Sequence, residues 1–176
     1  SAISNFWLPK ADSRKQIAKI MKNYLLKLAD DSLIMGQRLA EWCGKGPYLE
    51  EDIAVINIAL DQLGQANNFY NLAANLFNDG RTADDFAMLR VEKEYLNAQL
   101  VELPNGDYAN TIMKAYFFAV YQNLLYENLS HSADEELRAI AQKSLKEVKY
   151  HYTHTETWMR IFAQGTEESR KRIEAA

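Results

Sequence analysis

The stretches Asp61-Gln62-Leu63-Gly64-Gln65 and Glu147-Val148-Lys149-Tyr150-His151 decide the fold. Both lie in long segments whose apolar residues recur at helical spacing. Helical bundles that hold two iron ions carry Glu-x-x-His motifs at such positions, with further carboxylates from two other helices. Here the pairs read Gln62-x-x-Gln65 and Val148-x-x-His151. Two amides, a valine and one histidine do not supply the anionic oxygens that neutralise an iron pair. We therefore interpret these four residues as vestigial ligand positions and expect a structural protein rather than an enzyme.

The composition is that of one ordinary domain built from helices. The chain has 176 residues, of which 48% are hydrophobic, enough to bury a continuous core. None of the prolines, Pro9, Pro47 and Pro104, interrupts a periodic segment, which favours a few long helices. We therefore predict an all-α fold and a single helical domain over residues 1–176.

Charge and cysteine content exclude several classes of protein. The single cysteine, Cys43, rules out an intramolecular disulfide and sites ligated by several thiolates. The formal charge of −4, with scattered basic residues, indicates no cluster of positive charge of the kind that binds nucleic acid. No apolar run approaches the length of a membrane span, and Ser1 to Leu8 lacks the features of a signal peptide. We expect a cytoplasmic protein with neither nucleic acid nor membrane as a partner.

Periodicity, capping residues and turn residues place six helical segments. Gly44-Lys45-Gly46-Pro47 ends the first segment, Asn78-Asp79-Gly80 the second and Pro104-Asn105-Gly106-Asp107 the third. The predicted ranges are Asp12 or Ser13 to Trp42, Glu50 to Phe77, Thr82 to Leu103, Tyr108 to Leu129, Ser132 to Phe162 and Glu167 to Ala176.

The plan of long helix, short turn and long helix appears twice, around the connecting segment Thr82 to Leu103. Two antiparallel pairs joined by a crossover are how a ferritin-like bundle is assembled. The sequence thus predicts a ferritin-like four-helix bundle with a connecting crossover helix. A plain four-helix bundle fits the periodicity nearly as well.

The second helix carries an apolar stripe with a row of amides beside it. We expect some of the amides to bond across the bundle, because unpaired buried amides are costly. A substrate-contacting role for Gln62 and Gln65 is the weaker alternative. The expected inward stripe is Ile53, Ile56, Leu60, Leu63, Ala66, Tyr70, Ala73 and Leu76, and the amides are Gln62, Gln65, Asn68, Asn71 and Asn75.

His151 lies on the expected inward stripe of the fifth helix, which is Leu137, Ile140, Ser144, Val148, His151, Thr155, Trp158 and Phe162. One interpretation makes it a metal ligand, with Glu147 and His154 nearby. The favoured one is a core histidine satisfied by Glu147 or by a polar group from another helix, because a lone imidazole binds metal weakly. On the first helix, Asp30 or Asp31 could offer one carboxylate to a metal site, but Ser32 shares the most inward position there. On the second helix, Asp61 remains the single possible oxygen ligand. Glycine-rich phosphate loops and Gly-x-Ser-x-Gly elbows are absent from the sequence.

Four stretches together carry a specific resemblance over nearly the whole chain. They resemble the C subunit family of the bacterial phenylacetyl-CoA epoxidases, multicomponent oxygenases of aerobic phenylacetate degradation. The strings QRLxEW, LDxLGQAxN and LVExPNGD in combination are not general bundle patterns. The stretches are Leu28 to Cys43 (LADDSLIMGQRLAEWC), Ala54 to Tyr70 (AVINIALDQLGQANNFY), Leu100 to Ile112 (LVELPNGDYANTI) and Lys146 to Trp158 (KEVKYHYTHTETW).

The resemblance implies a role without a metal. In that family the homologous A subunit holds the di-iron centre and the CoA substrate, and the C subunit is its metal-free helical partner. Carried over by position, the A subunit's motifs fall on Gln62 and Gln65 and on Val148 and His151. Its first-helix glutamate falls near Asp31 or Ser32, and its remaining carboxylate between Ala119 and Gln122, where this chain has no acid.

The resemblance therefore predicts no catalytic residue and no cofactor bound by this chain, with the di-iron centre in a partner subunit. Self-association is also expected. The family's C subunit extends through further helices past residue 176, so we expect this chain to be truncated at its C-terminus. Two alternatives remain: a stand-alone metal-dependent oxidoreductase using His151, Glu147, Asp61 and Asp31, and a CoA-ester-binding bundle using Lys45, Lys146 and Lys149.

Overall fold

The computed structural model describes residues 11–176, and these residues form helices and connecting segments without a strand. The prediction of an all-α fold is confirmed. In chain order the elements are α1 (Ala11–Ala40), α2 (Leu49–Phe77), α3 (Ala83–Met88), the 3₁₀ helix η1 (Glu92–Glu94), α4 (Gln99–Glu102), α5 (Tyr108–Leu129), α6 (Glu135–Gln164) and α7 (Glu167–Ala175).

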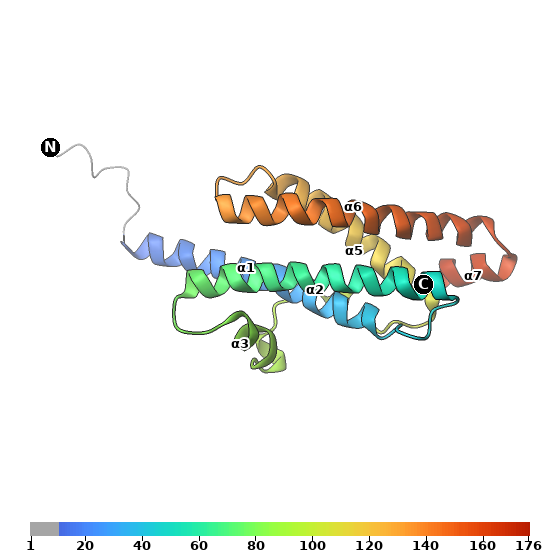
Figure 1. The fold of residues 1–176 in the computed structure, drawn as a ribbon, viewed down its shortest axis with the longest axis horizontal. Coiled ribbons are helices and arrows are strands. Elements are labelled where there is room, and N and C mark those ends of the chain that lie inside the picture. The colour runs from blue at the N-terminus through green and yellow to red at the C-terminus, as the bar shows by residue number, and fades with distance from the viewer. Residues whose placement is uncertain (1–10) are drawn as a thin grey trace.

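Four long helices form the bundle as two antiparallel pairs (Figure 1). α1 packs along α2, α5 packs along α6, and the pairs meet through contacts such as those of α2 with α6. Gly36 brings α1 and α2 close, because a Cβ atom there would lie 3.1 Å from the Ala59 carbonyl oxygen. α7 folds back against α5 and α6. The predicted four-helix bundle with a crossover is thus confirmed.

The crossover differs from its prediction. In place of one helix over Thr82 to Leu103, the segment contains the three short helices α3, η1 and α4. It starts as expected with a capping box, in which Thr82 Oγ1 accepts the Asp85 N–H and the Asp85 carboxylate accepts the Thr82 N–H. The helix then stops at Met88, and Arg90 turns inward to pair with Asp30 of α1. A buried ion pair between this segment and α1 thus outweighs local helix propensity.

Most other boundaries agree with the predictions to within about two residues. α5 has the predicted bounds, α6 ends at Gln164 rather than Phe162, and α1 ends at Ala40 rather than Trp42. Asp12 and Ser13, where the helix was predicted to begin, lie within α1. Asn78, in the left-handed region at φ 48°, ends α2 and donates its N–H to the Ala74 carbonyl oxygen. None of the helices in residues 11–176 is both long and apolar enough to cross a membrane.

The predicted inward face of α2 is correct at Ala66, Tyr70 and Ala73 and wrong at Ile53, Leu60 and Leu76. Ile53, Leu60 and Leu76 are exposed, whereas Gln62 and Gln65 are buried. α2 is therefore rotated relative to the prediction, so that the two amides point into the core with Val55, Ile58, Ala59, Ala66, Phe69, Tyr70 and Ala73. The stripe predicted for the fifth helix is correct at its centre, because Ser144, Val148, His151 and Thr155 are all buried.

Candidate functional site

A buried polar network lies at the centre of the bundle, where all four long helices contribute a side chain. Its core is a reciprocal amide pair between Gln62 of α2 and Gln122 of α5. Gln62 Nε2 donates to Gln122 Oε1 at 2.6 Å, and Gln122 Nε2 donates to Gln62 Oε1 at 3.0 Å. Each amide is 2% exposed. Such a pair satisfies a donor and an acceptor on each side chain without any charge.

The network extends from this pair to α1 and to Gln65. Gln122 Nε2 also lies 3.4 Å from Ser32 Oγ of α1 and 3.3 Å from Gln65 Oε1. The Tyr126 hydroxyl donates to Gln65 Oε1 at 3.0 Å, and burial raises the pKa of this tyrosine, which stays neutral. Gln65 Nε2 in turn donates to Glu147 Oε2 of α6 at 2.9 Å. The expected pairing of the amides across the bundle is confirmed for Gln62 and Gln65.

His151 of α6 is held from both sides by α2. Its Nε2 lies 2.9 Å from Asp61 Oδ2, and its Nδ1 lies 3.3 Å from Gln62 Nε2. The carboxylate accepts a hydrogen bond from Nε2–H of the neutral imidazole, so Nδ1 is the acceptor for the amide. Burial lowers the pKa of His151, with Asp61 opposing the effect. The prediction of a core histidine satisfied by another helix is confirmed, and its partners are Asp61 and Gln62 rather than Glu147.

The buried residues at the centre of the bundle do not fit a di-iron centre. Gln62, Gln65 and Gln122 carry no charge, and Val148 has no donor atom, whereas such a centre needs several carboxylates. Among the described residues, no group of three or more His, Cys, Asp or Glu could hold a metal ion. The cavity beside Gln62 and His151 measures about 10 Å³, the space of one water at most. The network therefore fills the centre of the bundle with hydrogen bonds.

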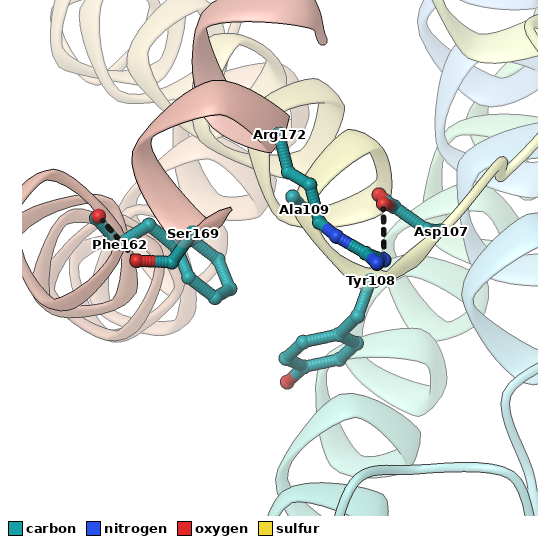
Figure 2. Close-up of a pocket in the computed structure, with 6 residues that line it drawn as sticks. All are labelled: Asp107, Tyr108, Ala109, Phe162, Ser169 and Arg172. Atoms are coloured by element: carbon teal, nitrogen blue, oxygen red, sulfur yellow. Dashed lines mark hydrogen bonds and ion pairs between the residues drawn. The ribbon is translucent and has the colours of Figure 1, made fainter. Parts of the chain in front are cut away.

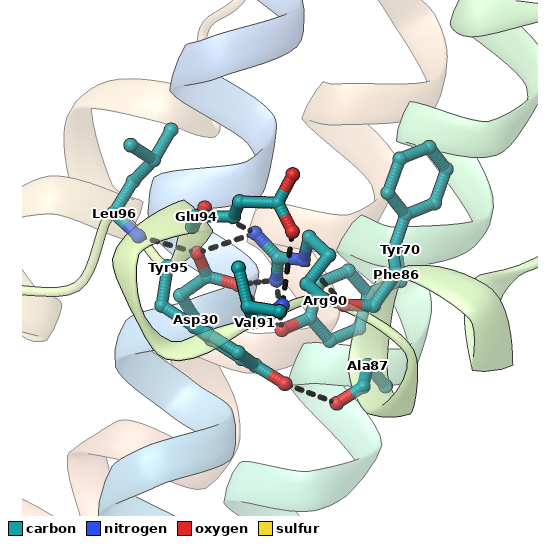
Figure 3. Close-up of polar contacts among 9 residues, drawn as sticks. All are labelled: Asp30, Tyr70, Phe86, Ala87, Arg90, Val91, Glu94, Tyr95 and Leu96. Carbon is teal, nitrogen blue, oxygen red and sulfur yellow. Dashed lines mark hydrogen bonds and ion pairs between the residues drawn. The ribbon is translucent and has the colours of Figure 1, made fainter.

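The acids of the alternative metal site point in different directions. Asp61 contacts His151, whereas Glu147 contacts Gln65. Asp31 faces the crossover, where its Oδ1 accepts the Ala98 N–H at 2.5 Å. Asp30, beside it, binds Arg90, the Tyr70 hydroxyl and the Leu96 N–H (Figure 3). Both first-helix acids thus fasten the crossover to α1, a role that spacing along the sequence does not reveal.

A separate hollow of about 190 Å³ lies where α5 begins and α7 folds back (Figure 2). Arg172 of α7 reaches Asp107 at 3.3 Å, and Ser169 Oγ donates to the Phe162 carbonyl oxygen at 3.0 Å. Tyr108 also lines this hollow, and its hydroxyl donates to Glu51 of α2 at 2.8 Å. These contacts tie α7 and α2 to the start of α5, and none of the lining residues belongs to the amide network.

The lysines of the CoA-binding alternative are only partly brought together. Lys146 and Lys149 line an open groove of about 540 Å³ on α6. Lys143, which the sequence reasoning missed, is the third lysine there, and its spacing of three residues from Lys146 was the available signal. Lys45 lies in the turn between α1 and α2 and does not line this groove.

Comparison with known proteins agrees with the resemblance carried by the four stretches. A family model described as "Phenylacetic acid catabolic protein" matches residues 6–176. The chain belongs to the phenylacetic acid catabolic protein family. This member is 42% identical over 153 residues to the C subunit of the 1,2-phenylacetyl-CoA epoxidase of Escherichia coli (strain K12). The match covers 87% of this chain and 61% of that protein, so this family member spans about three-fifths of its relative's length. The similarity supports involvement in phenylacetate catabolism.

Proposed function

We propose that this chain is a structural, non-catalytic subunit of a phenylacetyl-CoA epoxidase that supports an iron-bearing catalytic subunit. The observation that carries the proposal is the amide network at the ligand positions. Gln62, Gln65 and Gln122 bond to one another and to Tyr126. The similarity to a protein named as an epoxidase subunit supports the assignment of this chain to an epoxidase complex.

The network gives the subunit a core that needs no metal. A four-helix site with several carboxylates is held together by the cations that neutralise them, whereas paired amides are satisfied without one. Gln62 uses one amide proton for Gln122 and one for His151. A helical frame of this kind stays folded whether or not iron is present, which suits a partner that only supports the catalytic subunit.

The stand-alone oxidoreductase has less support from the geometry. It requires Asp31 to join His151 and Asp61, but Asp31 bonds to the backbone of the crossover at Ala98. Glu147 is engaged by Gln65. A shared metal would require the crossover contact and the amide network to break together.

Iron content and complex formation test the proposal. The full-length protein is loaded anaerobically with ferrous iron, washed with a chelator and analysed for iron per chain, with the di-iron subunit as the positive control. We expect near-zero iron and, at micromolar concentrations, co-elution with the di-iron subunit at a fixed stoichiometry. One or two tightly held irons per chain would instead support the enzyme, and separate elution of the two proteins would refute the structural role.

A further inference from the structure

A row of tryptophan and tyrosine rings lies at the end of the bundle where the α1–α2 turn, the start of α5 and the end of α6 meet (Figure 1). The ring centroid of Tyr108 is 5.2 Å from that of Trp42 and 5.4 Å from that of Trp158. Tyr48 extends the row, with its centroid 6.1 Å from that of Trp158. Tryptophan and tyrosine are the aromatic side chains that lose an electron most readily, and neighbouring rings exchange electrons fastest. The aromatic row is therefore a continuous path for one electron.

The two central rings of the aromatic row share one proton acceptor. The Tyr108 hydroxyl and the Trp158 indole N–H both donate to Oε2 of Glu51 on α2, each at 2.8 Å. Trp42 differs, because its indole N–H donates to the Thr111 hydroxyl at 2.9 Å, and a hydroxyl is a far weaker base than a carboxylate. Of these two tryptophans, Trp158 is thus the one whose proton already points at a base.

The shared carboxylate matters because these rings lose an electron easily only when they also lose a proton. An oxidised phenol or indole is a strong acid, and a buried radical cation is costly unless its proton leaves. Burial and the hydrogen bond to Glu51 both raise the pKa of Tyr108, so this phenol keeps its proton at neutral pH until its electron leaves. The hydrogen bonds to Glu51 provide the path for that proton.

His154 is the other titratable group beside this carboxylate, with its Nε2 atom 3.3 Å from Glu51 Oε2. Burial lowers the pKa of His154, although Glu51 opposes the effect. The imidazole is therefore uncharged at neutral pH and does not hold Glu51 in an ion pair. The side chains of Glu51 and His154 are 12% and 11% exposed, so the proton exchange takes place mostly shielded from water.

We propose that Trp158, Glu51 and Tyr108 form a relay that moves a one-electron oxidising equivalent from Trp158 to Tyr108. A one-electron oxidant takes an electron from the Trp158 ring, and the indole N–H proton passes to Glu51, which leaves a neutral tryptophanyl radical. Tyr108 then gives its electron to that radical, while Glu51 returns its proton to the indole nitrogen and accepts the phenolic proton. Trp158 is restored, and Tyr108 is a neutral tyrosyl radical beside a protonated Glu51. An electron from an external thiolate and the proton held by Glu51 restore Tyr108.

The relay needs only this chain, whereas the source of its oxidant rests on the proposed function. A subunit that supports an oxygen-activating iron centre is exposed to oxidising species that escape from that centre. A neutral tyrosyl radical is a weaker oxidant than a tryptophanyl radical, so the transfer to Tyr108 is favourable. In this setting the relay removes oxidising equivalents from Trp158 before they damage its indole ring.

Pulse radiolysis with azide radicals tests the relay on the full-length protein alone. The azide radical oxidises tryptophan faster than tyrosine, so Trp7, which lies outside the described residues, and Trp42 are first replaced by Phe to leave Trp158 as the site of oxidation. In this background protein we expect the absorption of the tryptophanyl radical to decay as that of the tyrosyl radical rises. The rate should be first order and independent of protein concentration, because the transfer is intramolecular.

Two substitutions in the background protein separate the roles of base and electron donor. Glu51→Gln keeps a carbonyl oxygen for both donors but removes the base, and Tyr108→Phe keeps the ring but removes the phenol. We expect each to slow the transfer by at least about tenfold. The control is Tyr95→Phe in the crossover, where the hydroxyl donates to the Ala87 carbonyl oxygen at 2.7 Å, and the rate should not change. Circular dichroism checks that all variants fold.

Deuterium oxide tests the proton transfer without a substitution at the relay. Because a proton moves with the electron, the background protein should transfer more slowly in deuterium oxide, and equal rates in the two solvents would contradict the relay.

The inference would also be overturned by an unchanged rate in Glu51→Gln or Tyr108→Phe, by an equal loss in Tyr95→Phe, or by tryptophanyl decay without a tyrosyl rise. None of these measurements contains the di-iron subunit. Failure of the proposed function is seen separately, as a lack of co-elution with that subunit.

Discussion

Asp31 is a buried acid with only one of its carboxylate oxygens bonded. Ala98 N–H donates to Oδ1, and Oδ2 has no hydrogen-bond partner in the described structure. Burial raises the pKa of this acid from 3.8 to about 6, although the Ala98 bond and Lys27 oppose the shift. The fold therefore prefers the protonated acid, and at neutral pH Asp31 weakens rather than strengthens the native state.

The sign of this effect gives a prediction for Asp31→Asn. Between pH 4 and 6 the folded chain binds more protons at Asp31 than the unfolded chain does, so the wild type loses stability as pH rises through this range. The amide keeps an acceptor for Ala98 and cannot ionise. We expect the variant to exceed the wild type in unfolding free energy at pH 7 by about 1 to 2 kcal/mol. The two should agree near pH 4.

Urea denaturation at several pH values measures this difference. Asp84→Asn, at an exposed acid in the first turn of α3, is the control and should change stability by no more than about 0.5 kcal/mol at any pH. A destabilised Asp31→Asn at pH 7 would mean that the carboxylate charge is required in the native state.

Sequence reasoning identified His151 as an inward residue but left its partner open. The periodic spacing of Val148, His151 and Thr155 determines which side of the helix faces the core, and that part is local. The partner Asp61 lies 90 positions away in the chain. Spacing along the chain carries no information about a pairing at that distance, so Glu147, the acid four residues earlier, was an equal candidate.

Among the elements, the crossover depends on one arginine. Arg90 lies between Asp30 and Tyr70 and also donates to the carbonyl oxygens of Phe86 and Glu94 (Figure 3). These bonds fix α3 and η1 against α1. Its side chain is 8% exposed and that of Asp30 is fully buried, so the pair is shielded from solvent.

Arg90→Met should detach the crossover. It leaves Asp30 as a buried charge without its main partner, and breaking such a pair costs about 3 to 5 kcal/mol. Arg81→Met, which removes the exposed pair with Asp79 in the turn just before the crossover, should cost at most about 1 kcal/mol. Thermal unfolding compares the two variants, and hydrogen exchange should show faster exchange at residues 83–102 in Arg90→Met. Equal losses in the two variants would show that the buried pair is not what fastens the crossover.

The crossover and α2 also show which structural features sequence patterns do not predict. The segment between the capping residue Thr82 and Pro104 has the sequence pattern of one helix. The helix nevertheless ends before Arg90, whose side chain pairs with Asp30 of α1. On α2, a preference for apolar residues placed Ile53 and Leu60 inward. The core instead receives Gln62 and Gln65, because Gln122, His151 and Glu147 offer them partners.

At the scale of the whole molecule, the amide network joins the two helical pairs. Ser32 comes from α1, Gln62 and Gln65 from α2, Gln122 from α5 and His151 from α6. Apolar contacts alone allow two helical pairs to slide, because one apolar side chain can replace another at similar cost. The hydrogen bonds are satisfied in one register only, so the network specifies how the pairs fit together.

A double-mutant cycle measures this coupling. Gln62→Met and Gln122→Met keep side-chain volume, but each leaves the other amide unpaired and should cost about 1 to 3 kcal/mol. The double variant removes both partners, so its cost should fall short of the sum by about 1 kcal/mol or more. In the control cycle, Gln62→Met is combined with Gln142→Met at an exposed amide of α6, and the two costs should add within about 0.5 kcal/mol. Additivity in the Gln62 and Gln122 cycle would mean that apolar packing holds the two helical pairs together, and that these amides do not fix the register of the pairs.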